Sequence, residues 1–172
     1  MQNKARSIVL GISLVLSSCT KNNLNKIKVA IVAPPLSTDP LDYDSSVSHN
    51  TMRSVYASLV SHYQRGKITP QIAKSWSHSD DFKIWELVID KQWTFENGDF
   101  ITPEIVERNF KRLMIIKNKS NSKSGLLEFV KGVKRLKSLD DKIEGIQVHG
   151  EKIKFIFDRE MKDFLLKIIK VN

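Results

Sequence analysis

The feature that most constrains the fold of this chain is an uncharged, mostly apolar run at residues 8–16, near the amino terminus. Lys4 and Arg6 precede the run, and small residues lead from it to Cys19, the single cysteine of the sequence. A positive start, an apolar centre and small residues at the end are the three parts of an export signal. A membrane-spanning helix needs about 20 consecutive apolar residues, so this run is too short to be one. We therefore expect residues 1–18 to be a removable signal.

The four residues Leu16-Ser17-Ser18-Cys19 resemble a lipobox, the processing site of bacterial lipoproteins. The resemblance implies that the Cys19 thiol receives a diacylglyceryl group and that cleavage occurs before it. Two acyl chains hold a protein on a bilayer, where one chain alone binds only marginally. A secretory signal cut without lipid attachment is the other interpretation of this run. We expect a cell-membrane lipid anchor on the extracytoplasmic side, periplasmic or external, followed by a flexible polar spacer to residue 26.

Composition places the rest of the chain among ordinary globular domains. Removal of residues 1–18 from the 172-residue chain leaves 154 residues, a typical length for one domain. The hydrophobic content of 41% and the charged content of 27% are also typical. The formal charge of +9 falls to +7 without Lys4 and Arg6, and such a charge suits nucleic acid or an anionic surface. Export excludes nucleic acid as the partner.

The densest basic stretch has two interpretations, a solvated face or a surface attracted to anionic lipid headgroups beside the anchor. Its members are Lys117, Lys119, Lys123, Lys131, Lys134, Arg135 and Lys137.

Alternating hydrophobicity predicts several β-strands. Residues 27–33 form a β-branched run that ends at two prolines. Two hairpins are expected at 76–90 and 143–157, with turns at 79–81 and 149–150.

Helical periodicity and capping signals predict four helices and several weaker elements. A helix capped by Ser48 should bury one stripe, made of Met52, Val55, Tyr56 and Leu59. A second helix should begin at Thr102-Pro103-Glu104, with a buried stripe of Val106, Phe110, Leu113 and Met114. The remaining expectations are a turn or short helix at 68–74, a polar loop at 117–124, a helix at 126–137 and a final helix at 161–169.

The sequence contains no recognisable catalytic or metal-binding pattern. The histidines at positions 49, 62, 78 and 149 lack metal-ligand spacing, and no phosphate-cradling loop or nucleophile elbow occurs. The acidic pairs 80–81 and 140–141 fall in turns, where aspartate bonds to the backbone. Trp76, Trp85 and Trp93 could form an aromatic ligand platform, but the strand positions favour core packing. We therefore expect neither an enzyme nor a cofactor.

The order of motifs along the chain resembles the opening of the family 5 solute-binding proteins, the peptide- and nickel-binding receptors of ABC importers. The likeness begins at 37–40, 55–60 and 68–76, and it continues through 85–89, 95–102, 111–113, 143–148, 153–157 and 164–165. Three positions depart from the family pattern. Phe82 stands where glycine is usual, Ile105 where a carboxylate follows the helix cap, and Asn109 where serine is common.

The resemblance implies a mixed α/β (α+β) fold of the type II periplasmic-binding-protein class. Family members are much longer and have two lobes, so we expect an incomplete first lobe. Residues 27–56 would begin its ligand-proximal part, and residues 57–172 would form its accessory subdomain. In peptide-binding members a loop after the Asp-Pro pair offers backbone groups to the extended ligand. The matching positions are Asp44, Ser45 and Ser46, although a plain polar surface loop is the other interpretation of this segment.

Two functions follow from these expectations. The first is a lipid-anchored receptor that delivers a peptide or another small solute to an ABC permease. The second is a truncated lipoprotein with a structural or interaction role and no transport activity.

Overall fold

The computed structural model describes Ala30, Ser37, Asp39 and the ranges 46–62, 66–119 and 127–169. The chain divides into two compact units, residues 1–32 and 33–172, and only Ala30 of the first is described. The predicted signal, the lipidation site and the strand at 27–33 therefore lie outside the described residues, apart from Ala30. All the features below belong to the second unit.

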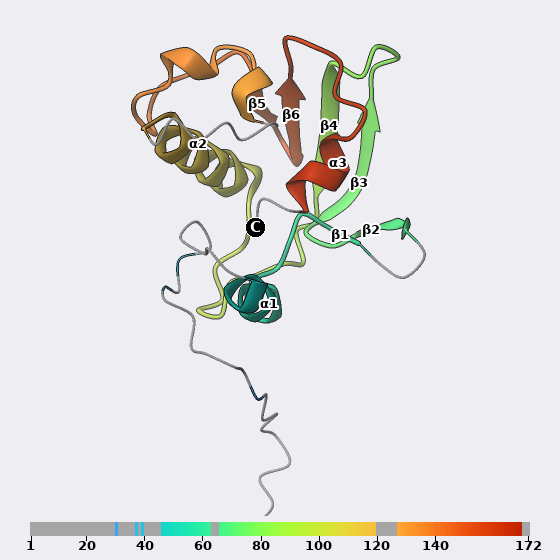
Figure 1. Ribbon diagram of the computed structural model, residues 1–172. Helices are drawn as coiled ribbons and strands as arrows, with labels where there is room; N and C mark the ends of the chain where they lie inside the picture. Colours follow the sequence, from blue (N-terminus) through green and yellow to red (C-terminus); the bar gives the residue numbers. More distant parts are fainter. Residues whose placement is uncertain are drawn as a thin grey trace, which may run out of the picture. The chain divides into compact units, whose positions relative to one another are not determined.

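A four-stranded antiparallel sheet forms the centre of this unit (Figure 1). Its strands are β3 (Ala73–His78), β4 (Ile84–Ile89), β5 (Ile146–His149) and β6 (Lys152–Ile156), in the order β3-β4-β6-β5. The β3–β4 and β5–β6 pairs are the two predicted hairpins, which are confirmed. The pairing of β4 with β6 joins the hairpins into one sheet.

Alternation along the two central strands gives the sheet one buried face. On β4, Trp85 and Leu87 are buried, and they lie opposite the buried Phe155 and Ile153 of β6. Because successive side chains of a strand point to opposite faces, Glu86 and Lys154 lie together on the other face. The hydrophobic core therefore occupies one side of the sheet.

Helix α2 (Pro103–Lys119) packs against β5 and β6 on this buried side (Figure 1). Thr102 accepts a hydrogen bond on its hydroxyl from the Ile105 N–H at 3.4 Å, which confirms the predicted cap. The predicted stripe is buried as well, from Val106 to Met114. The helix continues to Lys119, so the loop expected from Lys117 was wrong for its first three residues. Lysine has good helix propensity and sustains the last turn.

Helix α1 (Ser46–Val55) is shorter than predicted, and its stripe is wrong in part. Ser48 lies inside the helix and does not cap it. Met52 is buried, whereas Val55 is 71% exposed and Tyr56 is 43% exposed. The Tyr56 N–H closes the last turn on the Met52 carbonyl at 2.8 Å, and the chain then leaves the helix. Leu59, the fourth member of the stripe, is buried beyond the helix end.

The segment expected to be a turn or helix at 68–74 forms parts of two strands joined by a bend at 71–72. Strand β1 (Val60–His62) pairs with β2 (Ile68–Pro70) in a separate two-stranded sheet, and β3 begins at Ala73. The prediction from local periodicity was wrong because pairing with β1, which lies earlier in the chain, supplies the hydrogen bonds.

The helix predicted at 126–137 is also wrong. The chain forms two single 3₁₀ turns, η2 (Leu127–Phe129) and η3 (Val133–Arg135). Gly132 separates them with a φ of 82°, a left-handed conformation that an α-helix does not accept.

Aromatic side chains fill the core between the sheet, α2 and α3 (Phe164–Ile168). Phe155 contacts Phe110 and Phe164, with ring centroids 4.9 and 5.1 Å apart. Trp85 Nε1 donates to the Met161 carbonyl at 3.1 Å. The core interpretation of Trp85 is confirmed, and Trp76 and Trp93 pack half-buried against the same cluster. Within the described ranges, no helix combines the length and hydropathy of a membrane span.

Candidate functional site

Of the three residues predicted to touch a ligand, only Ser46 lies among the described residues. Asp44 and Ser45 lie outside the described residues, as does Cys19. Ser46 is the first residue of α1, and its side chain is not described. The ligand-contact and lipidation assignments therefore stay predictions.

Asp39, a few residues before this segment in the chain, forms an ion pair with Arg112 of α2. Arg112 of α2 presents both terminal nitrogens to Asp39: Nη1 lies 3.3 Å from Oδ1, and Nη2 donates to Oδ2. The Asp39 N–H also donates to the Ser37 hydroxyl at 3.0 Å. The side chains are 42% and 30% exposed, so water still reaches the pair. A two-pronged contact of this kind fixes direction as well as distance.

A small cavity lies just after α1. Its volume is about 80 Å³, and its lining includes Met52, Tyr56, Ser58, Gln71 and Ile169. The Ser58 N–H donates to Gln71 Oε1 at 3.1 Å, which holds the chain leaving α1 against the segment between β2 and β3. Ligand pockets typically measure about 300–1,000 Å³, so this cavity is too small to enclose a peptide.

A larger open groove of about 470 Å³ lies at the start of α2. Apolar side chains make up much of its lining, and Lys91, Glu104 and Glu151 supply its charges. The complete lining is Ile89, Lys91, Phe100, Ile101, Thr102, Pro103, Glu104, Gly150 and Glu151. Phe100 is 63% exposed, so the groove presents an aromatic ring to solvent.

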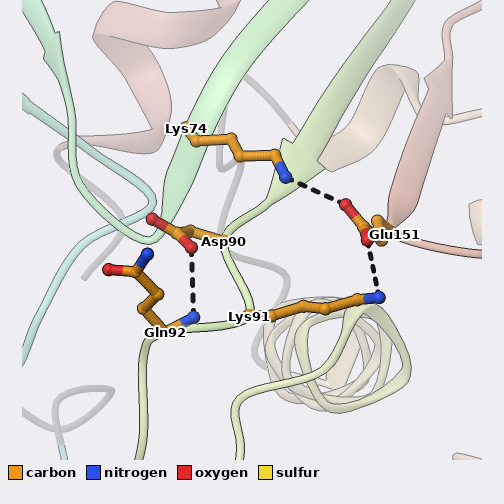
Figure 2. A network of polar contacts seen from close by, with 5 residues as sticks. All are labelled: Lys74, Asp90, Lys91, Gln92 and Glu151. Atoms are coloured by element: carbon orange, nitrogen blue, oxygen red, sulfur yellow. Dashed lines mark hydrogen bonds and ion pairs between the residues drawn. The ribbon is translucent and has the colours of Figure 1, made fainter.

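Figure 2 shows the polar network beside this groove. Glu151, in the turn between β5 and β6, accepts from Lys74 at 2.9 Å and from Lys91 at 2.6 Å. These hydrogen bonds, first that of Lys91 and then that of Lys74, lower the pKa of the Glu151 carboxyl to about 2. The Asp90 carboxylate accepts from the Gln92 backbone N–H at 3.0 Å. The network therefore joins the start of β3, the end of β4 and the β5–β6 turn.

The histidines and acidic pairs discussed below lie in hairpins and turns, where stacking or hydrogen bonds to the backbone account for several of them. His78 stacks on Phe82 with ring centroids 4.3 Å apart, and His149 is exposed in the β5–β6 hairpin. Asp81 accepts from the Ser79 hydroxyl and the Lys83 N–H, which lower its pKa. Two backbone N–H groups, those of Lys137 and Ser138, similarly lower the pKa of Asp141. Within the described part of the chain, no three histidine, cysteine or acidic residues are grouped to hold a metal.

Among the described members of the basic stretch, Lys117 of α2 is half-buried, and those from residue 131 to residue 137 are exposed, as predicted for a solvated face. Lys134, Arg135 and Lys137 are exposed, and Lys131 pairs with Glu144 at 2.9 Å.

Sequence reasoning missed two features of α2. Lys111 is only 6% exposed, and its Nζ lies 2.8 Å from Glu107 Oε1 and 3.5 Å from the Leu139 carbonyl. The spacing of Glu107 and Lys111 is a helical ion-pair signal, but it does not reveal the burial. The Arg112–Asp39 pair joins residues 73 positions apart, and nothing local in the sequence indicates it.

Comparison with known proteins identifies the family. Residues 67–170 match the model of the bacterial extracellular solute-binding proteins, family 5 middle. The chain belongs to this family. The family 5 chain is 35% identical over 60 residues to a nickel-binding periplasmic protein of Escherichia coli, and 33% identical over 70 residues to the periplasmic oligopeptide-binding protein OppA of Haemophilus influenzae. These matches cover 35% and 41% of this chain but only 12% and 13% of the two relatives.

Solved structures show the same fold in longer proteins. The Haemophilus influenzae OppA complex with the peptide RPPGFSPFR is 21% identical, with a TM-score of 0.66. The match covers 77% of this family 5 chain and 27% of OppA. The described mixture of helices and sheet therefore resembles part of a type II periplasmic binding protein, and the chain spans about a quarter of that structure's length.

Proposed function

We propose that this protein is a lipid-anchored, extracytoplasmic binding protein of an ABC import system, with a peptide as its solute. The observation that carries the proposal is the family 5 match across residues 67–170. Family 5 relatives bind solutes outside the cytoplasm, so the proposed role is capture and delivery without covalent chemistry. The peptide-bound OppA structure supports a peptide as the solute, and the nickel-binding relative provides the alternative ligand for the test.

The proposed anchor is Cys19, with residues 1–18 removed. Two acyl chains on this cysteine would bind the bilayer, and the spacer to residue 26 would set the reach of the folded part. Lys131, Lys134 and Arg135 are exposed and suit a position near anionic lipid headgroups.

The proposed binding segment is the loop that leads into α1. Residues 27–56 would start the ligand-proximal part, and Asp44, Ser45 and Ser46 would offer backbone groups to an extended peptide. Residues 57–172 would form the accessory subdomain. An added strand gains its affinity from main-chain hydrogen bonds, so this arrangement would accept peptides of varied sequence.

The partial coverage of the relatives favours a second candidate function. A pocket that buries most of a ligand needs walls on opposite sides, and this chain spans about a quarter of the OppA structure. The second candidate is therefore a lipoprotein with a structural or interaction role that binds no solute by itself.

Thermal unfolding of residues 19–172 with and without ligand separates the two candidates. A ligand that binds only the folded state raises stability by about 2.7 kcal/mol at 100 times its Kd. A rise in Tm with a random tripeptide pool supports the peptide receptor, and a rise with nickel and histidine alone supports the other ligand class. A folded sample that responds to neither overturns solute binding and supports the structural role.

The anchor needs a separate experiment. Globomycin, which inhibits the lipoprotein signal peptidase, should cause a lipidated precursor to accumulate. The Cys19→Ser variant should not be labelled by a fatty-acid probe and should leave the membrane fraction. Membrane retention of Cys19→Ser would overturn the lipid anchor without affecting the binding proposal.

A further inference from the structure

The short hairpin at 93–101, between β4 and α2, carries an asparagine–glycine pair at its tip. The Ile101 N–H donates to the Trp93 carbonyl at 2.9 Å and closes the base of this hairpin. At the tip, Asn97 is exposed and Gly98 has a left-handed φ of 90°. We infer that Asn97 is a site of self-modification, at which the Gly98 nitrogen closes a ring on the Asn97 amide and expels ammonia.

Contacts with Asp99 orient the Asn97 amide for this reaction. The Asp99 N–H donates to Asn97 Oδ1 at 3.1 Å, and Asn97 Nδ2 donates to Asp99 Oδ2 at 2.7 Å. One end of the amide thus meets a donor and the other an acceptor, which fixes its orientation. The first of these bonds closes a ring of atoms that includes both Asn97 Cγ and the Gly98 nitrogen. The carbon to be attacked and the attacking nitrogen are therefore held within one turn.

The same backbone N–H favours the attack electrostatically. Negative charge develops on Asn97 Oδ1 as the Gly98 nitrogen adds to Cγ, and the Asp99 N–H already donates to this oxygen. A donor that is in place before the reaction stabilises such a charge without reorganisation.

The tip of the hairpin leaves room for a ring and for water. Residues 94–100 are all exposed, and a side-chain carbon added at Gly98 would meet no atom within 4 Å. The Gly98 N–H donates to the Phe95 carbonyl at 2.9 Å, so this hydrogen bond must open before the attack. An exposed turn with few buried contacts opens locally at a low free-energy cost.

The reaction needs only water as a co-reactant. The Gly98 nitrogen forms a bond to Asn97 Cγ, the Cγ–Nδ2 bond breaks, and the Gly98 amide proton passes through solvent to the departing ammonia. Water then adds to either carbonyl of the resulting succinimide. Opening at the Cγ side leaves aspartate, and opening at the main-chain side leaves isoaspartate. Nothing is oxidised or reduced.

Both products should loosen the hairpin. Aspartate at position 97 places a carboxylate against Asp99 where the amide donor stood, and like charges at this spacing repel. Isoaspartate adds a carbon to the main chain, inside the turn that the Phe95 N–H closes on the Asp99 carbonyl at 2.8 Å. Phe100, which follows this turn, lines the open groove at the start of α2. The modification therefore acts on one wall of that groove.

Peptide mapping by mass spectrometry tests the inference on the purified protein, incubated at a mildly alkaline pH. Asn97 should lose its amide at least about tenfold faster than Asn109, an exposed residue that lies within α2 and precedes Phe110. The products should include isoaspartate, and the rate should rise with pH because the attack removes the Gly98 amide proton. Gly98→Ala should slow the loss about tenfold, since a methyl group crowds the attacking nitrogen.

Hydrogen exchange tests the structural consequence. After conversion, exchange at the Phe95 and Ile101 amides should be faster, and exchange in β4 and β6 should stay unchanged. Asn97→Asp should reproduce part of this effect without incubation. Asn97→Gln is the matched control, because its longer side chain keeps the amide but closes a ring less readily, so it should convert far more slowly.

Each measurement has an outcome that contradicts the inference. Loss of the Asn97 amide no faster than that of Asn109 overturns it. Aspartate without isoaspartate also overturns it, because water has then attacked the side chain directly and no ring has formed. Unchanged exchange in the fully converted protein overturns the loosening of the hairpin. All three results are independent of solute binding and of the lipid anchor.

Discussion

Glu151 is the carboxylate whose surroundings alter its chemistry most clearly among the described residues. Two lysines from different segments donate to it, and its folded-state pKa of about 2 lies below the ordinary value of 4.5. A carboxyl group with a lowered folded-state pKa stabilises the protein above the unfolded-state pKa, and this contribution is lost as the pH falls. The loss therefore occurs between about pH 4.5 and pH 2.

The Glu151→Gln variant should reveal this window. Its free energy of unfolding should be lower than that of the unaltered protein by a constant amount above about pH 5.5. The difference should shrink as the pH falls from 4.5 and vanish near pH 2. Urea unfolding at a series of pH values measures this difference, and the control is Glu96→Gln, at an exposed turn between β4 and α2. A difference that does not change with pH would show that Glu151 acts by packing and not by charge.

Phe82 combines two opposing effects at one position. Its φ of 54° lies in the left-handed region, which costs a residue with a side chain roughly 1–2 kcal/mol. Its ring stacks on His78, and the Lys162 ammonium lies 5.5 Å from the ring centroid. The resemblance to family 5 implies glycine at this position, and glycine adopts a left-handed φ without strain.

Glycine and alanine variants separate the two effects. Both Phe82→Gly and Phe82→Ala lose the ring, but only glycine adopts the left-handed conformation without strain. Phe82→Gly should therefore be more stable than Phe82→Ala by about 1 kcal/mol. The neighbouring control, Lys83, has an ordinary φ, so Lys83→Gly should be less stable than Lys83→Ala. Urea unfolding measures the stability of all four variants. If glycine and alanine rank in the same order at positions 82 and 83, backbone strain at Phe82 is contradicted.

At the scale of elements, sequence patterns were sufficient where the determining contacts are local. Strict alternation identified both hairpins, and the Thr102-Pro103 start identified α2. The patterns failed where a distant partner decided the structure, as in the pairing of β2 with β1. They also failed at 126–137, where the left-handed φ of Gly132 interrupts a helix. The Arg112–Asp39 pair, which joins distant segments, left no local signal.

The start of α2 lacks one half of a capping box. Thr102 accepts from the N–H of Ile105, which occupies the third helical position. A glutamate at this position would accept in return from the Thr102 N–H. Ile105 is 37% exposed, so a polar side chain at this position can still reach water.

Ile105→Glu should raise the free energy of unfolding by about 0.5–1 kcal/mol, through the added hydrogen bond and the favourable helix dipole. Ile105→Lys is the matched control, because lysine is equally polar but cannot accept the bond and opposes the dipole. Thermal unfolding should rank the glutamate variant above the unaltered protein and the lysine variant below it. Equal Tm values for the two variants would exclude the capping effect.

At the scale of the whole molecule, residues 33–172 form one compact unit whose elements meet at β6. This strand pairs with β4 on one side and β5 on the other, and α2 packs against it. Phe155 of β6 is fully buried between Phe110 of α2 and Phe164 of α3. A defect at this position should therefore weaken both hairpins and both helices at once.

Phe155→Ala should lower the free energy of unfolding by about 3–5 kcal/mol, the usual cost of emptying an aromatic site in a core. Domains of this size have about 5–15 kcal/mol in total, so the variant should remain folded with little reserve. Tryptophan fluorescence, which reports on buried Trp85, and far-ultraviolet circular dichroism should give coincident urea transitions. Phe95→Ala, at a ring that is 45% exposed, should change the stability by less than about 0.5 kcal/mol. Separate transitions for the two probes would show that the β3–β4 hairpin, which carries Trp85, unfolds independently of the rest. The interpretation of residues 33–172 as one cooperative unit with a single core would then be wrong.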